Sequence, residues 1–113
     1  MQYKAVVFDL FETLITEWGH KKYTKNEICA DLGIERADFD TFWDEKAQDQ
    51  YEGKISYEDS LKYVCEKCGK SVDEETILNI LDKRIKTQSV CFEYVQPEVF
   101  QLLKTLKDLN IVL

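Results

Sequence analysis

The sequence predicts an α/β fold: an incomplete parallel-sheet core with an inserted four-helix segment, within 113 residues. Three observations predict this fold. A short apolar run from Tyr3 to Phe8 opens the chain, helical patterns fill its middle, and a last helical pattern at 97–109 leads into a second apolar run at 111–113. A strand, a long connection and a helix that leads into another strand are the parts of a right-handed parallel unit.

These patterns also predict how the chain is divided. Residues 1–17 are expected to form a first core segment, 18–92 the inserted helical segment, and 93–113 a second core segment that holds one helix and the start of a second strand. The remainder of the sheet is absent from this sequence. We therefore expect an uncovered sheet edge and helix face, which favour self-association.

The opening apolar run shows little alternation between apolar and polar residues. Such a run is typical of a strand that is covered on both faces, as in a parallel sheet between helices. The predicted strand ends at Asp9. Because α/β folds place their ligands at the carboxyl ends of parallel strands, Asp9 is the first candidate for a chemically active residue.

Four helices are expected in the middle of the chain, from residues that favour helix starts and helix ends. The second is predicted to run from Arg36 to Tyr51. The inner face of the fourth is predicted to consist of Ile77, Leu78, Ile80, Leu81 and Ile85. The residues expected to start or end these helices are Thr24, Gly33, Gly53, Ser56, Gly69 and Asp73. A further helix is expected to begin with Pro97 at its first position.

Composition limits the classes of partner. The net charge of −7 repels the phosphates of nucleic acids, so no nucleic-acid partner is expected. No stretch approaches the ~20 apolar residues that a membrane span requires, and no signal peptide is visible. No membrane partner and a cytoplasmic location are therefore expected. In that compartment the four cysteines should be reduced, and Cys65 and Cys68 are interpreted as part of an apolar helix face.

The most informative stretch is Val6-Val7-Phe8-Asp9-Leu10-Phe11-Glu12-Thr13-Leu14-Ile15. An apolar strand followed by Asp-x-x-x-Thr closely resembles the first motif of the haloacid dehalogenase-like hydrolase superfamily. The inserted helices and the helix that starts at Pro97-Glu98 are similar to the subfamily whose cap lies between the first and second motifs. The resemblance covers essentially the whole chain, as the N-terminal portion of such a protein.

The resemblance implies a role for three residues. Asp9 matches the nucleophile, whose carboxylate forms a covalent ester. The same carboxylate and the backbone carbonyl of Phe11 match ligands of Mg²⁺, which screens the charges of nucleophile and phosphate in the complete protein. Thr13 matches the residue whose hydroxyl holds the turn and orients Asp9. The implied activity is that of a phosphatase on a small phosphorylated metabolite, through an aspartyl ester.

Two departures from the motif leave alternatives open. Phosphatases of the family usually have Asp, a general acid, where this chain has Phe11, and usually have Gly where it has Glu12. Dehalogenases carry an aromatic residue at the position of Phe11, so a metal-independent 2-haloacid dehalogenase is the alternative enzyme. No residues match the later motifs, so this chain alone is expected to lack turnover and to bind Mg²⁺ weakly. A truncated, non-catalytic helical interaction module is the third possibility.

Overall fold

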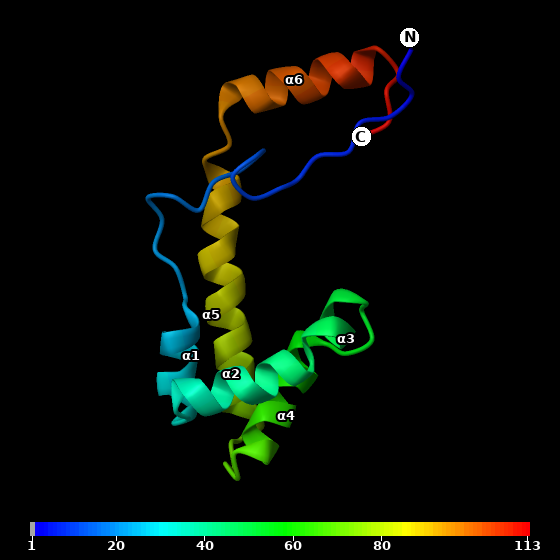
Figure 1. Ribbon diagram of the computed structural model, residues 1–113. Helices are drawn as coiled ribbons and strands as arrows, with labels where there is room; N and C mark the ends of the chain where they lie inside the picture. The colour runs from blue at the N-terminus through cyan, green and yellow to red at the C-terminus, as the bar shows by residue number, and fades with distance from the viewer. Residues whose placement is uncertain (1) are drawn as a thin grey trace. The chain divides into compact units, whose positions relative to one another are not determined.

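The computed structural model describes residues 2–113, and its regular structure is helical. Within this range the helices are α1 (Lys25–Leu32), α2 (Arg36–Glu45), α3 (Ala47–Tyr51), α4 (Tyr57–Lys67), α5 (Glu74–Glu93) and α6 (Pro97–Asp108) (Figure 1). No β-strand or sheet occurs among the described residues, so the predicted α/β fold with a parallel-sheet core is wrong. None of these helices is long and apolar enough to cross a lipid bilayer.

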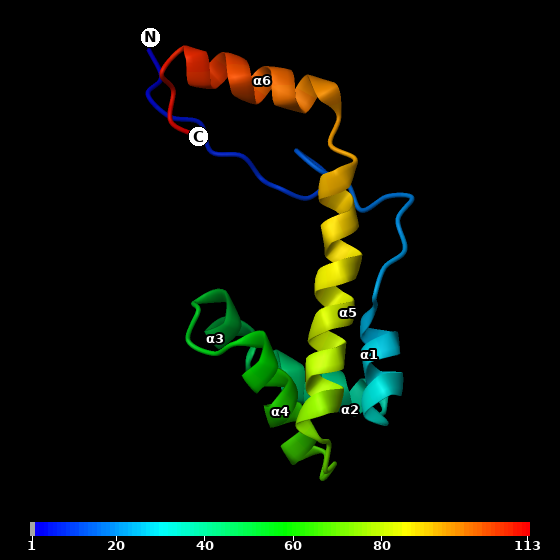
Figure 2. The ribbon, with the colours of Figure 1, turned by 180° about the vertical axis from the view of Figure 1, so that it is seen from behind.

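An isolated bridge stands where the two strands were predicted. Ala5 and Val112 pair in parallel, with hydrogen bonds from the Val6 amide to the Val112 carbonyl (2.8 Å) and from the Val112 amide to the Lys4 carbonyl (2.9 Å). The chain around these residues lies side by side in both views (Figures 1 and 2). The pairing does not extend into a sheet because it has no further strands beside it, and Val7, 95% exposed, is covered by nothing.

The chain divides into two compact units. One consists of Met1–Lys22 with Lys86–Leu113, and the other of Tyr23–Ile85. The boundary between the units falls within α5. We call them the terminal unit and the helical unit. The domain boundaries expected from the sequence stay a prediction.

The terminal unit has little buried apolar surface. Of its described residues, Ile15 and Cys91 are the buried hydrophobic ones. Its helix α6 begins with Pro97 at the first position, as predicted, yet none of its residues is buried. Some apolar side chains of α6 are half-buried, but Phe100, and Leu109 directly after the helix, are each at least 60% exposed.

Helices α1 and α4 of the helical unit begin at the capping residues that the sequence indicates. The Thr24 hydroxyl accepts a hydrogen bond from the Glu27 amide, and the Glu27 carboxylate accepts one from the Thr24 amide, which together form a capping box at α1. The Ser56 hydroxyl accepts from the Asp59 amide at 3.0 Å and caps α4. Gly33 ends α1 with a φ of 68°, a conformation that glycine adopts at little cost.

Helices α1, α2 and α4 lie against the first half of α5 (Figures 1 and 2). Their facing apolar side chains form one core. Its buried members are Ile28, Cys29, Leu32, Ile34, Phe39, Leu61, Val64, Cys65, Ile77 and Ile80. This core holds the helical unit together, since burial of apolar surface is the main driving force for packing helices.

The second predicted helix is broken in the structure. It ends at Glu45 and resumes at Ala47, and Lys46 between them has φ −104° and ψ −1°. The Lys46 amide bonds to the Trp43 carbonyl at 3.1 Å, which tightens the last turn of α2. The Lys46 ammonium lies over the ring of Tyr63 on α4, 4.4 Å from its centroid. The prediction of one continuous helix over Arg36–Tyr51 was therefore wrong. The contact of Lys46 with Tyr63 joins residues far apart in the sequence, so no local pattern indicates it.

Candidate functional site

The candidate nucleophile, Asp9, lies directly before a tight loop of residues 10–15. The three successive amides of residues 13–15 donate to the carbonyl oxygen of Leu10, at 3.4, 2.9 and 3.1 Å. Ile15 closes the loop and is 6% exposed, so its side chain anchors the loop in the terminal unit. The Asp9 side chain itself is exposed. The loop therefore leaves this carboxylate accessible to a small molecule.

Glu12 has the most unusual backbone in the loop. Its φ of 57° lies in the left-handed region, which residues other than glycine rarely adopt. Its amide donates to the Ile15 carbonyl at 2.6 Å. Its carboxylate accepts two further hydrogen bonds, from the Thr16 hydroxyl (2.6 Å) and from the Glu17 amide (2.7 Å). These two bonds, with a smaller attraction from Lys22, hold the pKa of Glu12 below its ordinary value of 4.5.

The other two residues singled out by the sequence lie in the same loop. Phe11 is 39% exposed and the Thr13 side chain is also exposed. Within residues 2–113 no hydrogen bond joins the Thr13 hydroxyl to the Asp9 carboxylate, and the expected orienting role of Thr13 stays a prediction. The loop thus brings Asp9, Phe11 and Thr13 together through chain connectivity.

The donors expected for Mg²⁺ do not make a complete site. Asp9 and the Phe11 carbonyl supply two oxygen atoms, and Mg²⁺ requires six ligands in near-octahedral geometry. Among the described residues, no group of three or more His, Cys, Asp or Glu side chains could hold a metal ion. The residues that the structure describes therefore do not fit a tight magnesium site.

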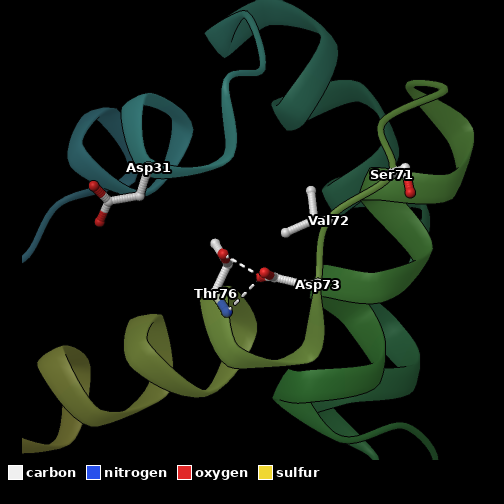
Figure 3. A pocket seen from close by; sticks show the side chains of 5 residues that line it. All are labelled: Asp31, Ser71, Val72, Asp73 and Thr76. Carbon is white, nitrogen blue, oxygen red and sulfur yellow. Dashed lines mark hydrogen bonds between the residues drawn. The ribbon is translucent and has the colours of Figure 1, made fainter.

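The helical unit has an open, polar pocket of about 390 Å³ at the start of α5 (Figure 3). The residues that line it are Asp31, Ser71, Val72, Asp73 and Thr76. The Asp73 carboxylate accepts hydrogen bonds from both the amide (2.9 Å) and the hydroxyl of Thr76. Asp73 therefore starts α5, as the sequence indicates, and these bonds lower the pKa of its carboxyl group. Its polar groups are occupied in capping the helix.

The Asp31 carboxylate at the edge of this pocket belongs to a network that the sequence did not reveal. It accepts a hydrogen bond from the Tyr23 hydroxyl and one from the Lys83 ammonium at 2.9 Å. The first bond, followed by the second, lowers the pKa of Asp31, while burial is the main cause of the raised pKa of Tyr23. The network ties α1 to α5. Asp31 and Lys83 are 52 residues apart in the sequence, so no local pattern indicates this network.

The cysteines have the environment of apolar side chains. Cys29 and Cys65 are buried in the core of the helical unit, and Cys68 packs against that core. Burial raises the pKa of all three thiols, which disfavours the reactive thiolate. The prediction that Cys65 lies on the inner face of its helix is confirmed.

Comparisons with protein-family models, with curated proteins and with solved structures find no match to this chain. The likeness of residues 6–15 to the first motif of haloacid dehalogenase-like hydrolases thus stays a prediction from the sequence.

Proposed function

We propose that this chain carries the nucleophile of a hydrolase that forms an ester at Asp9, and that its substrate is a small phosphorylated metabolite. One observation carries the proposal: Glu12 adopts the left-handed backbone conformation at φ 57°. Hydrolases of the haloacid dehalogenase-like superfamily usually have glycine at the matching position, and glycine is the residue that favours this conformation. The backbone conformation of Glu12 thus supports the proposal despite the change of side chain.

The chemistry requires an accessible carboxylate. An oxygen of the exposed Asp9 side chain attacks phosphorus, a phosphorus–oxygen bond forms, and the bond from phosphorus to the leaving group breaks. The leaving group departs with the electron pair of that bond. Phe11 cannot protonate it, so the leaving group must be stable as an anion or take a proton from water. Water then hydrolyses the aspartyl phosphate.

This chain is expected to form the ester rather than to turn over substrate. Its sequence has no residues that match the later motifs of the family, which supply a lysine and an acidic pair. Without such groups the charge on the transferred phosphoryl group is poorly stabilised. The alternative enzyme is a 2-haloacid dehalogenase, which Phe11 favours. In that reaction Asp9 attacks carbon and a halide ion leaves.

The mass of the intact protein after incubation with a reactive donor tests the proposal. Acetyl phosphate is suited to this test because acetate leaves without a general acid. We expect the 113-residue chain to gain one phosphoryl group. The gain should be absent in Asp9→Asn and retained in Asp38→Asn, which removes an exposed carboxylate from α2.

A parallel incubation with 2-chloropropionate separates the alternatives. An adduct of the haloacid on Asp9, with release of chloride and no phosphoryl adduct, would favour the dehalogenase. A wild-type protein that gains no mass from either reagent would contradict both enzymes. It would leave a non-catalytic helical module, consistent with the exposed α6.

A further inference from the structure

The loop after Asp9 is closed by a side chain as well as by backbone bonds. The Glu12 carboxylate spans from the turn to the segment that leaves it, with one oxygen on the Thr16 hydroxyl (2.6 Å) and the other on the Glu17 amide (2.7 Å). The Thr16 oxygen in turn accepts from the Trp18 amide at 3.0 Å. The sequence identified Glu12 only as a departure from the usual glycine, and its partners lie four and five residues further on.

The position of Glu12 makes these contacts necessary. A non-glycine residue at φ 57° is strained, and such a conformation persists only where the surroundings hold it. Besides its side-chain bonds, its amide donates to the Ile15 carbonyl at 2.6 Å, so the residue is fixed at three points. Hydrogen bonds to a charged carboxylate are stronger than those between neutral groups. The bonds made by Glu12 thus offset the strain of its backbone.

We propose that Glu12 is a positioning residue, whose carboxylate, held by Thr16 and Glu17, fixes the loop that presents Asp9 to a substrate. This inference rests on the proposed function, since it assigns a role in presenting the nucleophile. Glu12 follows Phe11 directly and lies three residues from Asp9. A change in the backbone of Glu12 therefore displaces Phe11 and Asp9. Small displacements of a reacting group lower rates strongly.

Two variants of Thr16 test the role without changing Glu12 or the strained backbone. Thr16→Val removes the hydroxyl donor and keeps the shape of the side chain, whereas Thr16→Ser keeps the hydroxyl. In Thr16→Val we expect the backbone amide hydrogens of Glu17 and of residues 13–15 to exchange with solvent about ten-fold faster than in the wild type. We also expect phosphorylation of Asp9 by acetyl phosphate to slow roughly ten-fold. Thr16→Ser should restore both.

A control on the helical unit separates a local from a global effect. The thermal unfolding of the helical unit, followed by circular dichroism, should be the same in both variants, because Thr16 lies outside Tyr23–Ile85. Unchanged exchange in Thr16→Val would overturn the inference. Faster exchange with an unchanged rate of Asp9 phosphorylation would overturn it too, since the loop would then not position the nucleophile.

The same experiment distinguishes failure of the inference from failure of the proposed function. If Asp9 gains no phosphoryl group in the wild type, the proposed function fails, and exchange alone decides the role of Glu12. Faster exchange throughout residues 13–15, which donate to Leu10, would then still show that Glu12 fixes the loop. Faster exchange confined to the Glu17 amide would overturn the inference.

Discussion

At the scale of single residues, Phe39 shows what the helical core contributes. Its side chain is fully buried, and its ring stacks on that of Trp43 with 5.2 Å between the centroids. Phe39→Ala leaves a cavity among the core residues and removes the stacking. We expect the free energy of unfolding to fall by about 3–5 kcal/mol, measured by urea titration with circular dichroism.

Tyr51 provides the matched control for this core variant. Its side chain is 87% exposed, so its removal leaves no cavity. Tyr51→Ala should change the free energy of unfolding by no more than about 0.5 kcal/mol. A loss below about 1 kcal/mol for Phe39→Ala would contradict the central place of Phe39 in the core.

Metal binding is also decided by single residues. Asp9 and the Phe11 carbonyl are the two ligands expected for Mg²⁺, and two protein ligands leave most of the octahedral shell to water. We expect isothermal titration to detect affinity in roughly the millimolar range or weaker. A saturable micromolar site that disappears in Asp9→Ala would contradict this, and would mean that other carboxylates complete the shell.

Part of the candidate site could be predicted from residues alone. The motif identifies Asp9, Phe11 and Thr13 because the order of residue types is visible in the sequence. The role of Glu12 could not be predicted in the same way. Its contacts depend on a left-handed backbone, which glutamate rarely adopts. They also depend on the Thr16 hydroxyl, which this backbone brings within hydrogen-bond distance of the Glu12 carboxylate.

At the scale of helices, the link between α1 and α5 is sensitive to pH. Hydrogen bonds from Tyr23 and then Lys83 hold the pKa of Asp31 below its ordinary value of 3.8. Because the pKa is lower in the folded state, the ionised carboxylate stabilises the fold above pH 3.8, and this contribution is lost as the pH falls through the lowered value. Its size should be at most about 1 kcal/mol, since the pair is partly exposed.

Denaturant titrations from pH 6 down to about pH 2 measure this contribution. Asp31→Asn should reduce the loss of stability in acid, and Tyr23→Phe, which removes the first donor, should reduce it in part. If Asp31→Asn shows the same acid dependence as the wild type, Asp31 is not the group responsible, and the proposed link between the two helices carries no pH-dependent stability.

The start of α4 depends on one hydroxyl. Ser56 accepts a hydrogen bond from the Asp59 amide at 3.0 Å, so Ser56→Ala leaves that amide without its capping partner. We expect a loss of about 1 kcal/mol in the free energy of unfolding. Ser71→Ala, at an exposed position outside the helices, is the control and should have little effect. Equal stability of the two variants would contradict the capping role.

Helix ends were more predictable than helix faces. Thr24, Ser56 and Pro97 act within one turn of the chain, so their roles follow from nearby residues. On the inner face expected for the fourth helix, α5, Ile77 and Ile80 are buried as predicted, but Leu78 and Ile85 are 50% and 60% exposed, so that part of the prediction was wrong. Which side of a long helix is covered depends on the arrangement of its neighbours, which the local pattern does not specify.

At the scale of the whole molecule, the predicted sheet failed for a related reason. The apolar run Tyr3–Phe8 has the composition of a buried strand, but a strand needs partners on its edges and cover on its faces. The described structure pairs this run with another segment only at the bridge between Ala5 and Val112, and Tyr3 and Val7 are 70% and 95% exposed. Sequence pattern indicates the preference of a segment and not whether its partners are present.

The exposed apolar residues of the terminal unit predict self-association. Helix α6 has no buried residue, and Leu102 is 47% exposed. Light scattering coupled to size exclusion should give a mass that rises with concentration. Leu102→Glu should lower this mass, whereas Gln101→Glu, which adds the same charge at an exposed polar position, should change it less. A monomer at every concentration would contradict the prediction.

We propose Asp9 alone, among the 22 Asp and Glu side chains, as the nucleophile. The most direct test is to locate the phosphoryl group by peptide mass spectrometry after reaction with acetyl phosphate and reduction with borohydride, which converts an aspartyl phosphate to homoserine. We expect homoserine at position 9 in the wild type and none at any position in Asp9→Asn. Modification spread over several surface carboxylates, or undiminished in Asp9→Asn, would contradict the claim that Asp9 is the nucleophile.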